Sequence, residues 1–186
     1  MTVRAFAAIF PPRGIQEALH RAALALPVEE AVRYVRPENI HLTMKFLGDV
    51  QPERLAGVEE TLASVGERHE PFEVALAGVG AFPSMRRGRV LWVGVSEGSE
   101  RLSEIATDME DVLESLGFER EPRAYRPHAT LGRARGRPFV LGETAALEKL
   151  TFRAETLTLV QSLLRKAGAT YEPLGVYPLV DGTRRN

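Results

Sequence analysis

The chain has 186 residues, a formal net charge of −1 at pH 7 and no cysteine. Its 44% hydrophobic and 26% charged residues are typical of a globular protein that can bury a sizeable core. The absence of cysteine excludes disulfides, thiolate metal sites and cysteine nucleophiles. The balanced net charge excludes a global electrostatic attraction to nucleic acid.

Hydrophobic periodicity and turn residues predict alternating strands and helices along the chain. In chain order we expect a strand over 3–10, a helix over 12–26, strands over 31–35 and 40–47, a helix over 52–65, strands over 72–79 and 89–95, a helix over 99–116, a strand around 125–133, a short helix over 142–150, and strands over 152–164 and 170–179.

The apolar N-terminal stretch, residues 1–11, is short, has no basic segment before it and ends at two prolines, so it does not have the pattern of a signal peptide. No apolar run approaches the roughly 20 residues of a membrane span. We therefore expect a cytoplasmic protein. One domain covering residues 1–186 accounts for the whole chain, and nothing in it requires more than a monomer.

Two short stretches, residues 40–46 and 125–133, share the order histidine, spacer, threonine, apolar residue. Side chains of a strand alternate between its two faces, so the polar residues of each stretch are expected on one common face. In the first stretch these residues are His41, Thr43 and Lys45. In the second they are Arg126, His128 and Thr130.

The predicted strands and helices alternate in two comparable rounds, and each round holds one His-x-Thr motif. This pattern predicts an α+β fold of two pseudo-symmetric lobes, each an antiparallel-rich sheet with helices on its outside. The catalytic cleft is expected between the sheets. Sequence identity between the rounds is confined to the motif, so the duplication is a hypothesis.

Three kinds of site could use a histidine pair. A metal site would want a third ligand, and His20 and His69 are poorly placed to supply it. A serine triad is disfavoured because the chain has no Gly-x-Ser-x-Gly. The third is acid–base catalysis by one neutral and one protonated imidazole, both accessible near pH 7. We favour it and expect no metal or other cofactor, although a metal-dependent hydrolase stays open.

Acid–base chemistry of this kind suits a phosphodiester, whose non-bridging oxygens need hydroxyl or cationic partners. Thr43, Thr130, Lys45 and Arg126 are of the required types. Ordinary β-propensity explains the threonines equally well. Arginine is abundant nearby, with six arginines and one acid between residues 120 and 137 and a second basic cluster at 86–89. Such clusters either bind phosphate or are simply solvated.

The two motif stretches resemble the paired signatures of the two-histidine (2H) phosphoesterases, and within them the RNA 2′,3′-cyclic phosphodiesterase branch, historically called 2′-5′ RNA ligase. Residues 4–9, 78–83 and 89–92 also fit that branch. The resemblance implies opening of an RNA 2′,3′-cyclic phosphate, or of a cyclic nucleotide, to a 2′-phosphate without metal or nucleotide cofactor. It also implies that some members form 2′-5′ linkages by the reverse reaction.

Carried over by motif position, the resemblance makes His41 the proton donor to the leaving 3′-oxygen and His128 the base that activates water. Thr43 and Thr130 would hold the non-bridging oxygens. Arg126 is the preferred phosphate contact, and Arg133 is undecided between site and surface. A non-catalytic module that binds RNA ends through its arginines and through Trp92 or Tyr125 is the alternative hypothesis.

Overall fold

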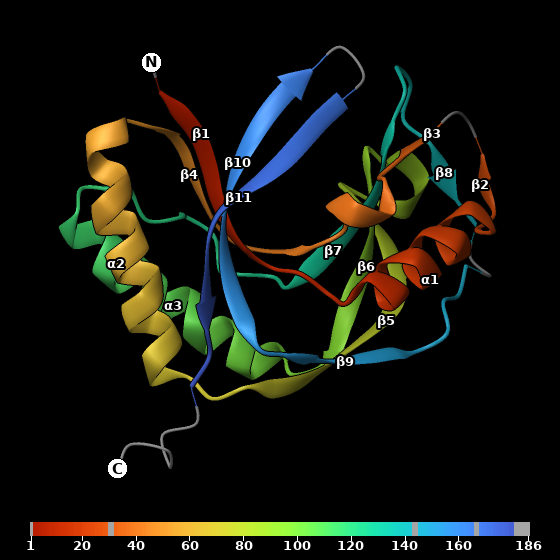
Figure 1. The fold of residues 1–186 in the computed structure, drawn as a ribbon. Coiled ribbons are helices and arrows are strands. Elements are labelled where there is room, and N and C mark those ends of the chain that lie inside the picture. The colour runs from red at the N-terminus through yellow and green to blue at the C-terminus, as the bar shows by residue number, and fades with distance from the viewer. Residues whose placement is uncertain (1, 30–31, 143–144, 166–167, 181–186) are drawn as a thin grey trace.

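The strands form one curled antiparallel sheet (Figure 1) in the computed structural model, which describes residues 2–29, 32–142, 145–165 and 168–180. Its strands are β1 (Val3–Ile9), β3 (Val32–Tyr34), β4 (Leu42–Val50), β5 (Phe72–Phe82), β6 (Val90–Glu97), β7 (His128–Ala134), β9 (Leu150–Ala154), β10 (Thr156–Arg165) and β11 (Gly168–Pro178). They run in the order β11-β10-β1-β4-β7-β6-β5-β9, and β3 pairs with β7. A separate pair joins β2 (Val28–Glu29) to β8 (Val140–Leu141).

The sheet has two lobes that meet where β4 lies beside β7. A single residue pair, Leu42 opposite Ala129, is the register recorded between these two strands. The strands β11, β10, β1 and β4 lie on one side of this joint, and β7, β6, β5 and β9 lie on the other. The predicted α+β fold with two lobes is therefore confirmed. The lobes nevertheless share one hydrogen-bonded sheet, and the chain crosses repeatedly between them, so they are not its consecutive halves.

The helices cover the outer faces of the lobes (Figure 1). They are α1 (Arg13–Leu24), α2 (Pro52–Arg68) and α3 (Ser99–Ser115), with short 3₁₀ turns η1 (Pro37–Asn39) and η2 (Met85–Arg87). The α2 and α3 helices pack on each other and beside β4, β10 and β11, whereas α1 lies beside β3, β7 and β9. No helix in the described ranges is long and apolar enough to cross a membrane.

The main core lies between the sheet and the helices, where apolar residues recur at helical spacing. Val58, Leu62 and Val65 of α2 are fully buried there. A second, smaller cluster lies on the opposite face of β1, where Phe6 and Ala8 pack with Val160. The β1 strand is thus buried on both faces, and the smaller cluster supports the cleft described below.

The predicted helix over residues 142–150 is wrong. Residues 145–149 have no regular structure, β9 begins at Leu150, and residues 143–144 lie outside the described part of the chain. Ala145 and Leu147 pack on the core two positions apart, which is the spacing of an extended chain and not of a helix. The predicted strand over 152–164 is divided at Glu155 into β9 and β10. The short strands β2 and β8 were not predicted.

Candidate active site

The two motif histidines are oriented in the same way by the backbone just before them. The Nδ1 atom of His41 lies 2.7 Å from the carbonyl oxygen of Asn39, and Nδ1 of His128 lies 2.7 Å from the carbonyl oxygen of Arg126. A carbonyl oxygen only accepts hydrogen bonds, so Nδ1 carries the proton in each ring and donates it. The Nε2 atom of each neutral ring is therefore left as the basic nitrogen.

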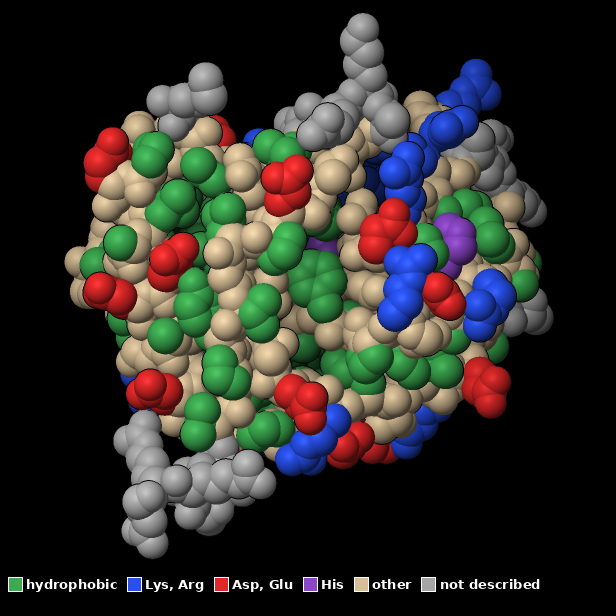
Figure 2. All heavy atoms as spheres, in the orientation of Figure 1, with side chains coloured by type: hydrophobic (Ala, Val, Ile, Leu, Met, Phe, Trp, Pro, Cys, Tyr) green, Lys and Arg blue, Asp and Glu red, His purple; other side chains and the backbone are tan. Residues whose placement is uncertain are grey.

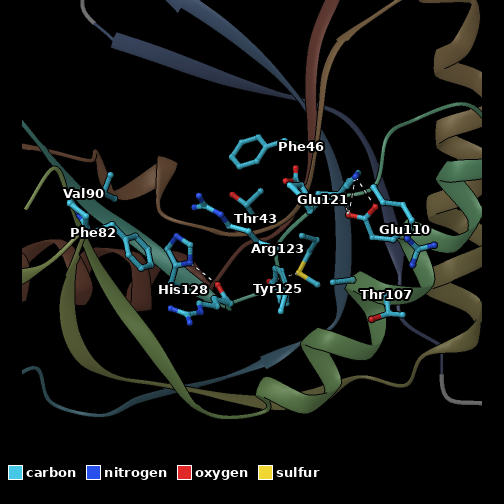
Figure 3. Close-up of a pocket in the computed structure, with 18 of the residues that line it drawn as sticks. Thr43, Phe46, Phe82, Val90, Thr107, Glu110, Glu121, Arg123, Tyr125 and His128 are labelled. Carbon is cyan, nitrogen blue, oxygen red and sulfur yellow. Dashed lines mark hydrogen bonds and ion pairs between the residues drawn. The ribbon is translucent and has the colours of Figure 1, made fainter.

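Pairing between β4 and β7 brings the two motifs together. Leu42 and Ala129, which face each other across the joint, are the central residues of the two His-x-Thr motifs. Because the strands are antiparallel, this register sets His41 level with Thr130 and Thr43 level with His128. Figure 3 shows Thr43 and His128 facing the same space. The register thus brings both predicted histidines and both predicted threonines close together, and Thr43 and His128 line one cavity.

The His41 ring packs against three aromatic rings. Its ring stacks on Phe6 at a centroid distance of 4.9 Å, lies 5.2 Å from Phe10, and meets the edge of Tyr171 at 5.3 Å. Burial lowers the pKa of His41 to about 4, although its hydrogen bond to the Asn39 carbonyl opposes this shift. In the free protein His41 is therefore neutral at pH 7. Its Nε2 lies 3.0 Å from the hydroxyl oxygen of Thr43, which donates the hydrogen bond.

Positive charge across the joint lowers the pKa of His41 further. The imidazole of His128 and the guanidinium of Arg133 both act on it in this direction. These charges come from β7, whereas His41 immediately precedes β4. Residues far apart in the sequence thus lie within electrostatic range of His41.

His128 lies against a second aromatic wall. Its ring meets the edge of Phe82 at 5.2 Å, and Trp92 lies 6.4 Å away. The indole of Trp92 covers Gly80, where a Cβ atom would overlap it, so glycine is required for this close approach. The indole N–H is buried without a hydrogen-bond partner among the described residues. Trp92 is thus a half-buried neighbour of Phe82 and His128.

A β-bulge after the first motif changes which side chains reach the cleft. In the pairing of β1 with β4, Ala8 faces Thr43 and Ala7 faces Lys45, so Met44 is an extra residue in β4. The alternation of faces is reversed beyond this point. Phe46 is 62% exposed as a result, whereas Lys45 turns to the side of the core.

Lys45 therefore does not lie beside His41 and Thr43, but it does line the cavity described below, so its role in substrate binding stays a prediction. Its ammonium group contacts both carboxylate oxygens of Glu110, at 2.9 and 2.8 Å, and the carbonyl oxygen of Glu119 at 2.6 Å. Only 2% of the side chain is exposed. Lys45 ties β4 to α3 and to the loop that follows α3.

A matching bulge follows the second motif. Trp92 faces Thr130 and Leu91 faces Gly132, so Leu131 is the extra residue in β7. This bulge turns Arg133 toward the same face as Thr130, in agreement with the effect of its charge on His41. Sequence periodicity could not reveal either bulge, because the extra residue is identified only by its partner strand.

Arg126 lies in the loop before β7, with an exposed side chain that lines the cleft. A hydrogen bond holds this loop against β4: the hydroxyl of Tyr125 donates to the sulfur of Met44 at 3.2 Å. Burial raises the pKa of this phenol above its ordinary value of 10. Tyr125 thus links the loop before the second motif to the bulge of the first.

The cleft opens into a cavity of about 1220 Å³, large enough for a nucleotide or a larger ligand. His128 and Thr43 lie at one end of it, and Thr107 and Glu110 of α3 lie at the other (Figure 3). Phe46, Phe82, Arg123 and Arg126 also line it. The lining thus combines apolar rings with cations, as a nucleotide requires.

The two remaining histidines have structural partners. Nδ1 of His20 donates a hydrogen bond to the carbonyl oxygen of Val35 at 2.8 Å, and Nε2 of His69 lies 3.0 Å from a carboxylate oxygen of Asp108. Asp108 also binds Arg68, which fixes the end of α2 to α3. Within the described ranges, no group of three or more His, Cys, Asp or Glu side chains is placed to hold a metal ion.

Comparison with known proteins identifies relatives over nearly the whole chain. A family model described as LigT-like phosphoesterase matches residues 9–92, which include the first motif. A protein of Methanothermobacter thermautotrophicus named RNA 2′,3′-cyclic phosphodiesterase is 34% identical over 96% of this chain and 100% of its own length. A protein of the same name from Aeropyrum pernix is 38% identical over 77% of this chain and 84% of its own.

Solved structures agree with these relatives. A crystal structure described as a phosphoesterase superimposes with a TM-score of 0.85 at 25% identity, covering 97% of this chain and all of the other. Escherichia coli LigT in complex with 3′-AMP gives a TM-score of 0.79 at 26% identity, again over 97% of this chain and all of the other. With a relative 34% identical along its entire length, the chain belongs to the LigT-like phosphoesterase family.

Proposed function

We propose that this protein hydrolyses 2′,3′-cyclic phosphate ends of RNA to 2′-phosphate ends by two-histidine acid–base catalysis. The observation that carries the proposal is the pairing of Leu42 with Ala129, which brings the two His-x-Thr motifs side by side, with Thr43 and His128 lining one cavity. The names of the relatives from Methanothermobacter and Aeropyrum support the substrate class. The complex of E. coli LigT with 3′-AMP supports a nucleotide as ligand.

In the proposed reaction, Nε2 of His128 accepts a proton from water while the water oxygen attacks phosphorus. The bond between phosphorus and the 3′-oxygen breaks, and a proton on Nε2 of His41 passes to that oxygen. The hydroxyls of Thr43 and Thr130 donate hydrogen bonds to the non-bridging oxygens. Each histidine contributes roughly 10²–10⁴-fold to the rate, because it transfers a proton from a fixed position beside the reacting atoms.

The low pKa of His41 means that the ring must take up its catalytic proton from solvent when the substrate binds. The free imidazole is neutral at pH 7, since its pKa is about 4. A cyclic phosphate brings one negative charge, which stabilises the imidazolium and opposes the effects of Arg133 and His128. Protonation of Nε2 also requires the Thr43 hydroxyl to turn, so that it accepts a hydrogen bond from the ring or donates one to the phosphate.

The same geometry supports the reverse reaction. A 5′-hydroxyl of RNA in the place of water would attack phosphorus, release the 3′-oxygen and leave a 2′-5′ linkage. We propose this joining activity as a minor one, since water is present at high concentration in an open cleft. We also propose that residues 1–186 act as one catalytic domain and as a monomer, because both histidines come from one chain. We propose a cytoplasmic location as well.

The deciding experiment incubates a 2′,3′-cyclic-phosphate-ended oligonucleotide with the protein in the presence of EDTA and identifies which hydroxyl retains the phosphate. We expect a 2′-phosphate at an undiminished rate. A rate abolished by EDTA and restored by a divalent cation would favour the metal-dependent hydrolase. Tight binding of the oligonucleotide without any opening of the ring would favour the non-catalytic module, for which the exposed arginines along the cavity are the supporting observation.

A further inference from the structure

Two arginines, Arg33 of β3 and Arg133 of β7, lie on the same face of the sheet as the cleft, beyond its edge. In the antiparallel pairing of β3 with β7, Arg33 lies directly opposite Arg133, and Arg133 lies opposite Val90 of β6. Val90 lines the cavity together with His128. Residues directly opposite each other project from the same face of a sheet. Arg33 therefore extends a row of side chains that begins in the cleft.

The neighbours of Arg33 confirm which face it occupies. Val32 and Tyr34, on either side of it in β3, both pack against the main core. Alternation along the strand directs Arg33 to the opposite face, which is the face of the cleft. Its side chain is exposed. Strands lie ~4.8 Å apart in a sheet, so Arg33 is one such step beyond Arg133.

Like charges directly opposite on adjacent strands repel each other and destabilise a sheet. Neither Arg33 nor Arg133 forms an ion pair or a side-chain hydrogen bond with any described residue. Some exposed arginines elsewhere on the described surface have acidic partners, as Arg13 has in Glu17, Arg68 in Asp108, and Arg153 in Glu73. Among the described residues, no carboxylate thus offsets the adjacent charges of Arg33 and Arg133, in a protein of net charge −1.

Figure 2 shows Lys and Arg side chains gathered on the upper right of this face, the region where β3 and the end of β7 lie in Figure 1. Since the charge of Arg133 reaches His41, this basic region begins at the catalytic histidines. A repeating anion leaving the cleft across β7 would meet Arg133 first and Arg33 next. A mononucleotide cyclic phosphate is too short to occupy both.

We propose that Arg33 binds a backbone phosphate of single-stranded RNA, upstream of the cyclic end held by the two histidines. The inference rests on the proposed function and refines its substrate: the site selects cyclic-phosphate-ended oligonucleotides over cyclic mononucleotides. Arginine suits this task because its planar fork of N–H groups matches two oxygens of a phosphate. Arg33 contributes to substrate binding and takes no part in the chemical step.

The test compares wild type with Arg33→Gln, and uses Arg153→Gln as a control that removes the same charge from another exposed strand position of the same lobe. The substrates are 2′,3′-cyclic AMP and a five-nucleotide RNA ending in a 2′,3′-cyclic phosphate. We expect wild type to prefer the RNA in kcat/KM. Arg33→Gln should lower the value for RNA roughly tenfold, through KM, and leave the value for cyclic AMP unchanged. Arg153→Gln should change neither.

Salt dependence gives a second readout. For the RNA substrate, the slope of log kcat/KM against log salt concentration should become shallower by about 0.7 in Arg33→Gln, the change expected for one lost contact to a single strand. Equal turnover of both substrates by wild type, or an unchanged ratio and slope in Arg33→Gln, would overturn the inference while the proposed function stands. Failure of wild type to open either substrate would overturn the proposed function and the inference together.

Discussion

The burial of His41 on aromatic rings predicts a specific loss of stability in acid. A pKa of about 4 in the folded protein, against 6.5 in an unfolded chain, means that the unfolded state binds the proton more tightly between these values. The free energy of unfolding must then fall as the pH is lowered from about 6.5 toward 4. Since one pKa unit corresponds to about 1.4 kcal/mol, His41 alone accounts for a loss of about 3 kcal/mol between pH 7 and pH 4.

The assay is urea unfolding of wild type and His41→Gln at pH 7, 5.5 and 4, followed by circular dichroism. Hydrogen bonds lower the pKa of Glu38, chiefly from its own backbone N–H, and that of Asp108, from Arg68 and His69, so both groups also destabilise the fold in acid, but they are present in both proteins. Their contribution cancels in the difference. We expect wild type to lose about 3 kcal/mol more than the variant. Equal losses in the two proteins would refute the account of His41 as a desolvated imidazole that is neutral at pH 7.

Three further substitutions test the surroundings of the site. Lys45→Met should lower the free energy of unfolding in urea by about 3 kcal/mol, because Glu110 is left unpaired. Adding Glu110→Leu to this variant should recover most of the loss. A raised KM in the double variant would instead identify Lys45 as a substrate contact. Tyr125→Phe should cost at most about 1 kcal/mol, the worth of its hydrogen bond to Met44, in the same assay. Gly80→Ala should cost roughly 1–3 kcal/mol and shift the fluorescence of the sole tryptophan, since the new methyl overlaps its indole; unchanged fluorescence would contradict the packing described.

Local sequence patterns predicted most of the fold because the apolar spacing of each long element agrees with its final burial. Helices α1, α2 and α3 were predicted within a few residues for this reason. The failures occur where tertiary pairing decides the conformation. The extra residues Met44 and Leu131 are defined only by neighbouring strands, so the reversed faces of Lys45 and Arg133 could not be read from the motifs.

The site itself was predictable in part. The recurrence of His-x-Thr located His41 and His128, and period-two alternation placed the threonines beside them. The ring that meets the edge of His41 comes from Tyr171 at the far end of the chain, and no local signal connects the two. Phe6 and Phe10 left a signal, since with Ala8 they make one face of β1 continuously apolar, as expected of a strand buried on both sides.

The central claim is that two histidines act on one phosphorus from opposite sides, and single-turnover hydrolysis of a cyclic-phosphate-ended oligonucleotide tests it most directly. We expect His41→Ala and His128→Ala each to lower the rate roughly 10²–10⁴-fold while circular dichroism shows a folded protein. His20→Ala, outside the cleft, should retain the rate of wild type. A folded His41→Ala or His128→Ala protein that keeps a rate within threefold of wild type would contradict the claim.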